Sequence, residues 1–408
     1  MTPSSGEGAG GGILFLDLEG GWGGSSRSLF HIVEAIDRDR FRPLVVLRKD
    51  GPVAERYRAL GVRFEIMPEL PAFRPAERKN AVSYGFYLWR ARKLGKVVER
   101  LRALADEIDA RLLYVNHESL ATAGAAIARR MGLPWVAHIR TELKPGIFAR
   151  RVYRTIAREA SHVVFIAEPV ADNFRKVAGC LPPEGNAEVL YNFTDARVAA
   201  DLPAPEAMRD DAALRVVLLS NFSPNRGIDR VVDVAEAVAR RGARDIRFYL
   251  FGRPAHANLL TGATDPYYAS VVEKARAGGV DDIVVFPGHT SAPDAALASA
   301  DVLIKLTREN NPWGRDIIEG LSAGRVVVTL GSYSAFIAHG ENGYLREAFD
   351  PDDIAAFLVA LRDDPALLAK IKEANAAKAR RLFSREAAAA RLHGIFTRVM
   401  AGTPRSNP

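Results

Sequence analysis

The sequence predicts a two-domain α/β protein in which two doubly wound parallel sheets face each other across a cleft. Short apolar, β-rich runs alternate with longer helical segments along nearly the whole chain. These runs are apolar throughout, which is typical of parallel strands that helices cover on both faces. A length of 408 residues allows two ordinary domains with large buried cores.

The expected strands form two series separated by a segment without strand character. The first series comprises Ile13–Leu18, Leu44–Arg48, Phe64–Met67, Leu112–Asn116, Trp135–Ile139, His162–Ile166 and Glu188–Tyr191. The second comprises Val216–Ser220, Phe248–Phe251, Ile283–Phe286, Val302–Leu306 and Val326–Thr329. Residues 199–213 are rich in Pro, Ala and Asp and predict a linker. We therefore expect a first domain over residues 13–198 and a second over residues 214–383.

Both ends of the chain carry a further prediction. Residues 1–12, MTPSSGEGAGGG, have neither the basic start nor the apolar centre of a secretory signal and predict a disordered lead-in. Residues 384–400 predict a helix with apolar residues at helical spacing. Its apolar positions are Ala388, Leu392, Ile395, Phe396 and Met400. Such a stripe must be buried, so this helix could pack back on the first domain.

Composition narrows the classes of function. The chain is 48% hydrophobic and 26% charged, as in globular proteins, and no uncharged apolar run approaches the roughly 20 residues of a membrane-spanning helix. The single cysteine, Cys180, excludes an internal disulfide and favours a reducing compartment, so we expect a cytoplasmic protein. The net charge of +7 indicates an anionic partner without naming it.

Several common cofactor motifs are missing. The P-loop pattern is absent, which argues against a P-loop nucleotidase. The glycine-rich run at residues 20–26 lacks the third spaced glycine of a dinucleotide fingerprint, and Arg48 and Lys49 stand where its acidic residue would be. One cysteine and eight histidines without an H-x-x-x-H pair give no zinc pattern. We therefore expect neither a dehydrogenase nor a metal site.

The most informative segment is residues 301–329, DVLIKLTRENNPWGRDIIEGLSAGRVVVT. It predicts a strand, a loop closed by Pro312-Trp313-Gly314, a helix from about Arg315, and another strand. The start of a helix offers backbone N–H groups and the positive end of the helix dipole, which suits a diphosphate. Glu319 lies further along this helix, where its carboxylate could accept hydrogen bonds from the two hydroxyls of a ribose.

This segment resembles the retaining glycosyltransferases of family 4, whose signature is E-x7-E with an aromatic-glycine pair after the first Glu. Trp313 and Gly314 match the pair, and Glu319 matches the second Glu, which the resemblance implies holds the ribose of the donor nucleotide. Asn311 replaces the first Glu, so an amide would take over its contact with the hydroxyls of the donor sugar. Glu309 could supply the missing carboxylate if the loop is rearranged.

The resemblance extends to the first loop of the second domain. The family has G-R-x4-K-G there, with an Arg and a Lys that grip the donor phosphates. Here Asn221 replaces the Arg, and Arg226, followed by Gly227, replaces the Lys. Arg226 would keep the phosphate contact, since a guanidinium bonds phosphate oxygens bidentately. Arg315 could restore the cation lost at Asn221.

The remaining candidate residues follow from the same resemblance. In the first domain Gly23 and Gly24 match a glycine pair whose backbone approaches the donor phosphates or the acceptor, and His138 takes the position of a histidine near the donor sugar. A purely structural histidine is the alternative. The further candidates are Arg140 for phosphate or acceptor recognition, and Arg253 and His289 in loops that flank the nucleobase or are ordinary turns.

The resemblance implies a GT-B fold, with two Rossmann-like domains, and a hexosyl-type transferase that moves sugar from a nucleotide sugar to a glycan or lipid-linked acceptor with retention. It implies a role in polysaccharide biosynthesis and no metal or other cofactor. We assign no catalytic nucleophile. A nucleotide-sugar epimerase of the same architecture, or a degenerate GT-B binding protein, remains an alternative. A basic nucleic-acid binder is a third possibility, but no RNA or DNA motif supports it, so we expect no nucleic-acid partner.

The basic, aromatic segment Arg74–Arg102 is open to two interpretations. It could contact an anionic membrane at its inner face and receive a lipid-linked acceptor. The alternative is an ordinary amphipathic helix packed on its own domain.

Overall fold

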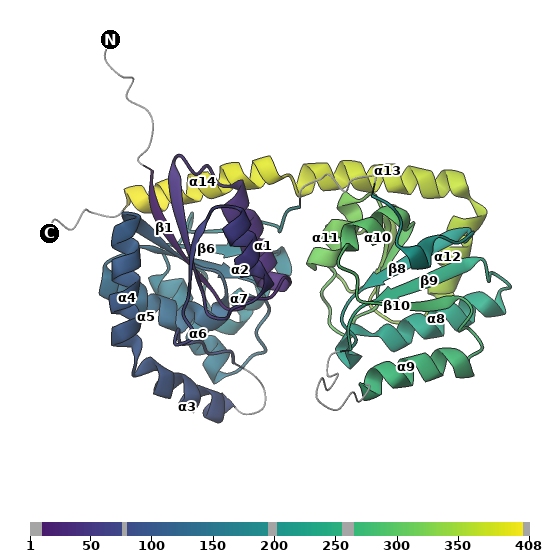
Figure 1. Ribbon diagram of the computed structural model, residues 1–408, viewed down its shortest axis with the longest axis horizontal. Helices are drawn as coiled ribbons and strands as arrows, with labels where there is room; N and C mark the ends of the chain where they lie inside the picture. Colours follow the sequence, from purple (N-terminus) through teal and green to yellow (C-terminus); the bar gives the residue numbers. More distant parts are fainter. Residues whose placement is uncertain (1–9, 76–79, 195–201, 255–264, 403–408) are drawn as a thin grey trace, which may run out of the picture. The chain divides into compact units, whose positions relative to one another are not determined.

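The computed structural model describes residues 10–75, 80–194, 202–254 and 265–402. The chain divides into two compact units, residues 1–193 with 385–408, and residues 194–384. Each unit contains one parallel sheet flanked by helices (Figure 1). The prediction of two doubly wound α/β units is therefore confirmed.

The N-terminal unit has a seven-stranded sheet in the order β3-β2-β1-β4-β5-β6-β7. Its strands are β1 (Gly11–Asp17), β2 (Phe41–Leu47), β3 (Arg63–Ile66), β4 (Ala110–Val115), β5 (Trp135–Ile139), β6 (His162–Phe165) and β7 (Ala187–Val189). Every neighbouring pair is parallel. All residues of β1 are buried, as expected for a central strand with helices on both faces. The strand order reverses between β1 and β4.

Helices cover both faces of this sheet (Figure 1). One face carries α1 (Gly24–Ala35), α2 (Pro52–Ala59) and α14 (Arg385–Ala401). The other carries α4 (Leu94–Glu107), α5 (Ala121–Met131), α6 (Ile147–Glu159) and α7 (Glu168–Ala178). Helix α3 (Asn80–Ala91) precedes α4, and a short 3-10 turn, η1 (Glu118–Leu120), precedes α5.

The last helix, α14, supplies part of this core. Its residues Ala388, Leu392, Ile395, Phe396 and Met400 belong to the same buried cluster as Ile13 and Phe15 of β1. The ring of Phe396 lies 5.5 Å from that of Phe41 and 5.9 Å from that of Tyr114, measured between centroids. The apolar stripe of α14 is therefore buried against the sheet of the N-terminal unit.

The second unit has a six-stranded parallel sheet in the order β10-β9-β8-β11-β12-β13. Its strands are β8 (Leu214–Leu219), β9 (Ile246–Phe251), β10 (Val284–Gly288), β11 (Val302–Lys305), β12 (Val326–Leu330) and β13 (Gly343–Arg346). One face carries α8 (Ile228–Arg240), α9 (Pro266–Ala277) and α12 (Pro351–Asp363). The other carries α10 (Pro293–Ser299), α11 (Arg315–Ser322) and α13 (Pro365–Leu382). The strand order reverses between β8 and β11.

Two boundary predictions need correction. Gly11 and Gly12 were expected in the lead-in but belong to β1, where Gly12 packs so closely on Ile108 that a side chain would not fit; residues 1–9 lie outside the described residues. The expected linker 199–213 is described from residue 202 and contains a 3-10 turn, η2 (Glu206–Met208). Within it, Asp210 accepts hydrogen bonds from Tyr249 at 2.5 Å and Arg247 at 3.0 Å, so this part is packed on the second unit.

Candidate functional site

The candidate residues of the second unit gather at one edge of its sheet. Asn221 follows β8, Arg253 follows β9, His289 follows β10, and the loop that leads to α11 follows β11. The carboxyl ends of parallel strands share an edge, and ligands of such sheets bind where the strand order reverses. Here that point lies between β8 and β11, whose loops carry Arg226 and Asn311.

These two loops are joined by several hydrogen bonds. The carbonyl of Asn225 accepts from the backbone N–H of Arg308 and from the hydroxyl of Thr307, both at 2.9 Å. The guanidinium of Arg308 forms two bonds with the carboxylate of Asp229, at 3.0 and 2.6 Å. The loop that carries Arg226 is therefore fixed against the loop that follows β11.

Arg226 is exposed at the end of a 3-10 turn, η3 (Pro224–Arg226). Among the described residues, none forms an ion pair or hydrogen bond with its guanidinium, so the charge is available to a ligand. Asn221 is differently placed, because its side-chain oxygen accepts the backbone N–H of Arg253 at 3.4 Å. The side chains of Arg253 and His289 are exposed at the same edge.

Helix α11 begins at Arg315 with Gly314 as its N-cap, which has no side chain to cap the helix, while the carboxylate of Asp316 in the first turn accepts the backbone N–H of Ile317 at 3.0 Å. The first intrahelical bonds run from the N–H groups of Ile317 and Ile318 to the carbonyl of Gly314, at 3.0 and 3.3 Å. Gly227 before α8 and Gly23 before α1 are also N-caps without a capping side chain. The first N–H groups of a helix lack intrahelical acceptors, so an uncapped start favours an anion.

Glu319 lies one turn into α11 and is only 8% exposed. Its Oε1 lies 3.8 Å from the guanidinium of Arg315, an i,i+4 pair on a largely buried face. The phosphate contact predicted for Arg315 stays a prediction, since the structure shows this side chain beside Glu319. The pair places a buried carboxylate and a cation together just behind the start of the helix.

The loop before α11 carries the residue that replaces the first Glu of the motif. The side-chain amide of Asn311 donates to the carboxylate of Glu309 at 3.2 Å, so a carboxylate does lie beside this position. The Oδ1 atom of Asn311 is buried, and no described residue donates to it. Trp313 is buried, with its ring edge-on to that of Tyr333 at 5.8 Å. Asn311 thus combines an anchored amide with an acceptor that a ligand hydroxyl could satisfy.

In the N-terminal unit, Gly23 and Gly24 form the turn into α1. Gly24 has φ of 49°, which favours glycine, and both residues are exposed. A side-chain carbon at Gly23 would meet no described atom within 4 Å. The fold itself therefore leaves open space beside the start of α1.

A buried network of hydrogen-bonded polar side chains lies next to this turn and bonds to its backbone at Ser25. Asn116 donates its side-chain amide to the carboxylate of Asp17 at 2.8 Å and to the carbonyl of Ser25 at 3.1 Å. Its oxygen accepts from Arg140 at 2.6 and 3.2 Å, and Arg140 also donates to Asn192 at 2.8 Å. Burial raises the pKa of Asp17 and lowers that of Arg140. The ligand contact predicted for Arg140 stays a prediction, and its visible role is to brace these loops.

His138 lies on β5, with only 2% of its surface exposed. Its Nδ1 shares a hydrogen bond of 2.5 Å with the hydroxyl of Tyr114. Burial first, and then the charge of Arg140, lower the pKa of His138 well below its usual range, so the ring is neutral near pH 7. Nε2 is buried, and no described residue bonds to it. The contact predicted with the donor sugar stays a prediction.

Sequence reasoning missed the polar residues that end apolar strands. Asp17 closes β1 and Lys305 closes β11, and both are buried. A charged residue at the carboxyl end of an apolar strand is a signal that could have identified them. Asn116, directly after β4, could have been found in the same way.

Comparison with known proteins agrees with this arrangement. The family described as "Glycosyl transferase 4-like domain" matches residues 23–192, and the family described as "Glycosyl transferases group 1" matches residues 213–364. An alpha-D-kanosaminyltransferase of Streptomyces kanamyceticus is 25% identical over 342 residues, 76% of this chain and 83% of that protein. An N-acetyl-alpha-D-glucosaminyl L-malate synthase of Bacillus anthracis is 24% identical over 191 residues, which are 45% of this chain. The chain spans about half, 46%, of the length of that relative.

Solved structures share the fold. The Anabaena protein HepE, crystallised with UDP and glucose, has a TM-score of 0.74 at 21% identity, over 94% of this chain and 99% of that chain. Sucrose-phosphate synthase of Thermosynechococcus elongatus has a TM-score of 0.71 at 16% identity, over 96% of this chain and 99% of that chain. With both units matched by family and the whole by fold, the chain belongs to the group 1 glycosyl transferases and has a GT-B fold with a glycosyl transferase 4-like N-terminal unit.

Proposed function

We propose that this glycosyltransferase moves a hexosyl group from a UDP-sugar to a glycan or lipid-linked acceptor with retention at the anomeric carbon. The proposal rests on two features that lie together where the strand order of the second unit reverses, between β8 and β11. One is the start of α11, whose N-cap is a glycine, and the other is the loop of Arg226, whose guanidinium pairs with no acidic residue among those described. The UDP and glucose bound to HepE support the choice of donor.

The geometry suggests how the leaving diphosphate would be stabilised. Negative charge grows on the diphosphate as the glycosidic bond to the donor breaks. Backbone N–H groups at the start of α11 and the Arg226 side chain are fixed in place beforehand, so they stabilise this charge without reorganising. Glu319 would accept the ribose hydroxyls, and the Asn311–Glu309 pair would bind hydroxyls of the sugar. In this proposal the charge is met by protein groups and needs no metal.

A thermal-shift panel of UDP, GDP, ADP and CMP tests the donor site. A ligand at about 100 times its dissociation constant stabilises a protein by about 2.7 kcal/mol, which is a shift of several degrees in Tm. We expect UDP to give the largest shift. A larger shift with GDP or ADP would reassign the nucleobase, and no shift with any nucleotide would favour a degenerate binding protein.

Product analysis separates transfer from epimerisation. We expect incubation with UDP-glucose to release UDP together with a glycoside or free glucose. Conversion of UDP-glucose into an isomeric nucleotide sugar, without UDP release, would instead support the epimerase alternative.

We further propose that the acceptor side works at an anionic membrane on its cytoplasmic face. No helix in the described part of the chain is both long and apolar enough to cross a bilayer. Helix α3 nevertheless exposes Phe86 and Trp89, and α6 begins with Ile147, which is 80% exposed. The two helices touch, since the rings of Tyr84 and Phe148 lie 5.2 Å apart. Large exposed apolar side chains next to cations suit a lipid interface.

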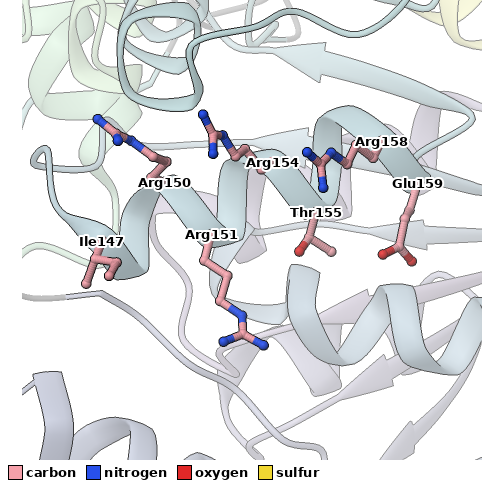
Figure 2. Close-up of a pocket in the computed structure, with 7 residues that line it drawn as sticks. All are labelled: Ile147, Arg150, Arg151, Arg154, Thr155, Arg158 and Glu159. Carbon is pink, nitrogen blue, oxygen red and sulfur yellow. The ribbon is translucent and has the colours of Figure 1, made fainter.

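The cations come from α6, which lines a pocket with four arginines (Figure 2). Figure 2 shows Arg150, Arg154 and Arg158 along one side of the helix and Arg151 on the other. Arg154 is held by the carbonyl of Ala178 at 2.9 Å. Within the described residues, no carboxylate pairs with Arg150, Arg151 or Arg158, so their charge can face anionic headgroups.

Replacing Arg150 and Arg158, which lie on the same side of α6, by glutamine is expected to weaken binding to phosphatidylglycerol vesicles by roughly 30-fold, at about 1 kcal/mol for each arginine near the surface. Co-sedimentation with vesicles measures this. The matched control is Arg175→Gln on α7, whose guanidinium pairs with Asp172 at 3.2 Å; this variant should bind as the parent does. A parent protein that does not sediment with these vesicles would contradict the membrane proposal.

A further inference from the structure

Lys305 is a buried cation directly below the loop that leads into α11. It is the last residue of β11, where Val302, Leu303 and Ile304 precede it, and only 7% of its surface is exposed. Its ammonium group donates to the carboxylate of Asp316 at 2.9 Å and to the carbonyl of Asn311 at 3.2 Å.

The two acceptors of Lys305 lie on either side of the Trp313-Gly314 bend. Asn311 precedes the bend and Asp316 is in the first turn of α11, so one ammonium group ties the loop to the helix. Burying an ammonium ion is costly unless it is paired and hydrogen-bonded. An apolar side chain would fill the end of an apolar strand without this cost. The cation therefore needs an explanation beyond packing.

The same ammonium group explains why the bend contains glycine. A side-chain carbon on Gly314 would lie 2.2 Å from Nζ of Lys305 and 2.5 Å from Oδ1 of Asp316. Since the ion pair occupies this space, any side chain at this position would have to displace Lys305 or Asp316. The glycine in turn supplies no capping side chain to the start of the helix.

We propose that Lys305 is a positioning residue for the donor diphosphate. It ties the loop to the first turn of α11 and so fixes the bend in the position where the N–H groups of that turn meet the phosphates. This inference rests on the donor site proposed above. The inference adds Lys305, which contacts the carbonyl of Asn311 and the carboxylate of Asp316 and not the ligand, and therefore acts on the diphosphate through the position of the loop and the helix.

The test compares a ligand with phosphates and one without. For Lys305→Met, we expect calorimetric titration to show affinity for UDP reduced by roughly 30-fold, as for the loss of a charged hydrogen-bonding group. Affinity for uridine, measured by NMR titration, should change by less than about 2-fold, because uridine has no phosphate to position. The matched control is Lys372→Met, which removes a lysine that pairs with Asp301 at 3.0 Å before the opposite end of β11; it should bind both ligands as the parent does.

Asp316→Asn provides a milder second variant, since it keeps the acceptor of Lys305 but removes the charge. We expect it to weaken UDP binding several-fold, and to add little in the Lys305→Met background, because the two residues act as a unit. If Lys305→Met is unfolded in a thermal melt, Asp316→Asn decides.

Three results would count against the inference. Unchanged UDP affinity in a folded variant would overturn it, and so would an equal loss for UDP and uridine, which is what a merely structural role predicts. A parent protein that binds neither UDP nor any other nucleoside diphosphate would instead overturn the donor site itself, and the inference with it.

Discussion

Replacing Glu319 by alanine is expected to weaken UDP binding by about 100-fold while leaving the fold intact. The carboxylate is buried in the first turns of α11. Two hydrogen bonds from ribose hydroxyls to a charged acceptor account for an effect of this size, at about 1.5 kcal/mol or more each. Isothermal titration calorimetry measures the affinity, and a thermal melt confirms that the variant is folded.

A deoxynucleotide makes this test specific for the ribose. The parent protein should bind UDP more tightly than 2′-deoxy-UDP, because the latter lacks one of the two hydroxyls. In Glu319→Ala this preference should vanish, and Glu319→Gln, which keeps one acceptor oxygen, should lie between the two. If the alanine variant still prefers UDP over its deoxy form, the ribose is held elsewhere.

Replacing Arg226 by alanine is expected to lower the kcat for donor cleavage by about 100-fold. Its guanidinium has no acidic partner among the described residues and extends from the loop fixed against the one after β11. Removing one preorganised donor to a developing anion typically costs roughly 100-fold or more in kcat. Hydrolysis of the donor needs no acceptor, so the rate of UDP release from UDP-glucose in water gives the measurement.

Two further arginine variants control this prediction. Arg226→Lys keeps a charge but loses the bidentate geometry, so it should recover part of the rate. Arg380→Ala removes an exposed arginine from α13 and should turn over like the parent. Equal rates for the two alanine variants would remove Arg226 from the site.

The strands of both units could be predicted from sequence because buried parallel strands are continuous apolar runs. The run at residues 302–306 predicted β11, and that at residues 326–329 predicted β12. Strand β13, Gly343–Arg346, was missed. Its four residues have glycine at one end and arginine at the other, and its pairing with β12 depends on tertiary contacts that no local pattern records.

The site could be predicted in part. The Trp313-Gly314 bend and Glu319 stand in one continuous segment with a recognisable spacing. The pairing of Lys305 with Asp316 could not be predicted, because it requires the chain to turn back on itself between the strand and the helix. The hydrogen bond between Asn311 and Glu309 could not be predicted either. It brings a carboxylate beside position 311, where the first Glu of the motif is replaced by Asn.

A crystal structure of the chain with UDP would locate the diphosphate directly. We expect it at the start of α11, within hydrogen-bonding distance of the first backbone N–H groups of that helix and of Arg226, with the ribose hydroxyls on Glu319. UDP bound at another edge of the sheet, or with its phosphates turned away from α11, would contradict the proposed donor site.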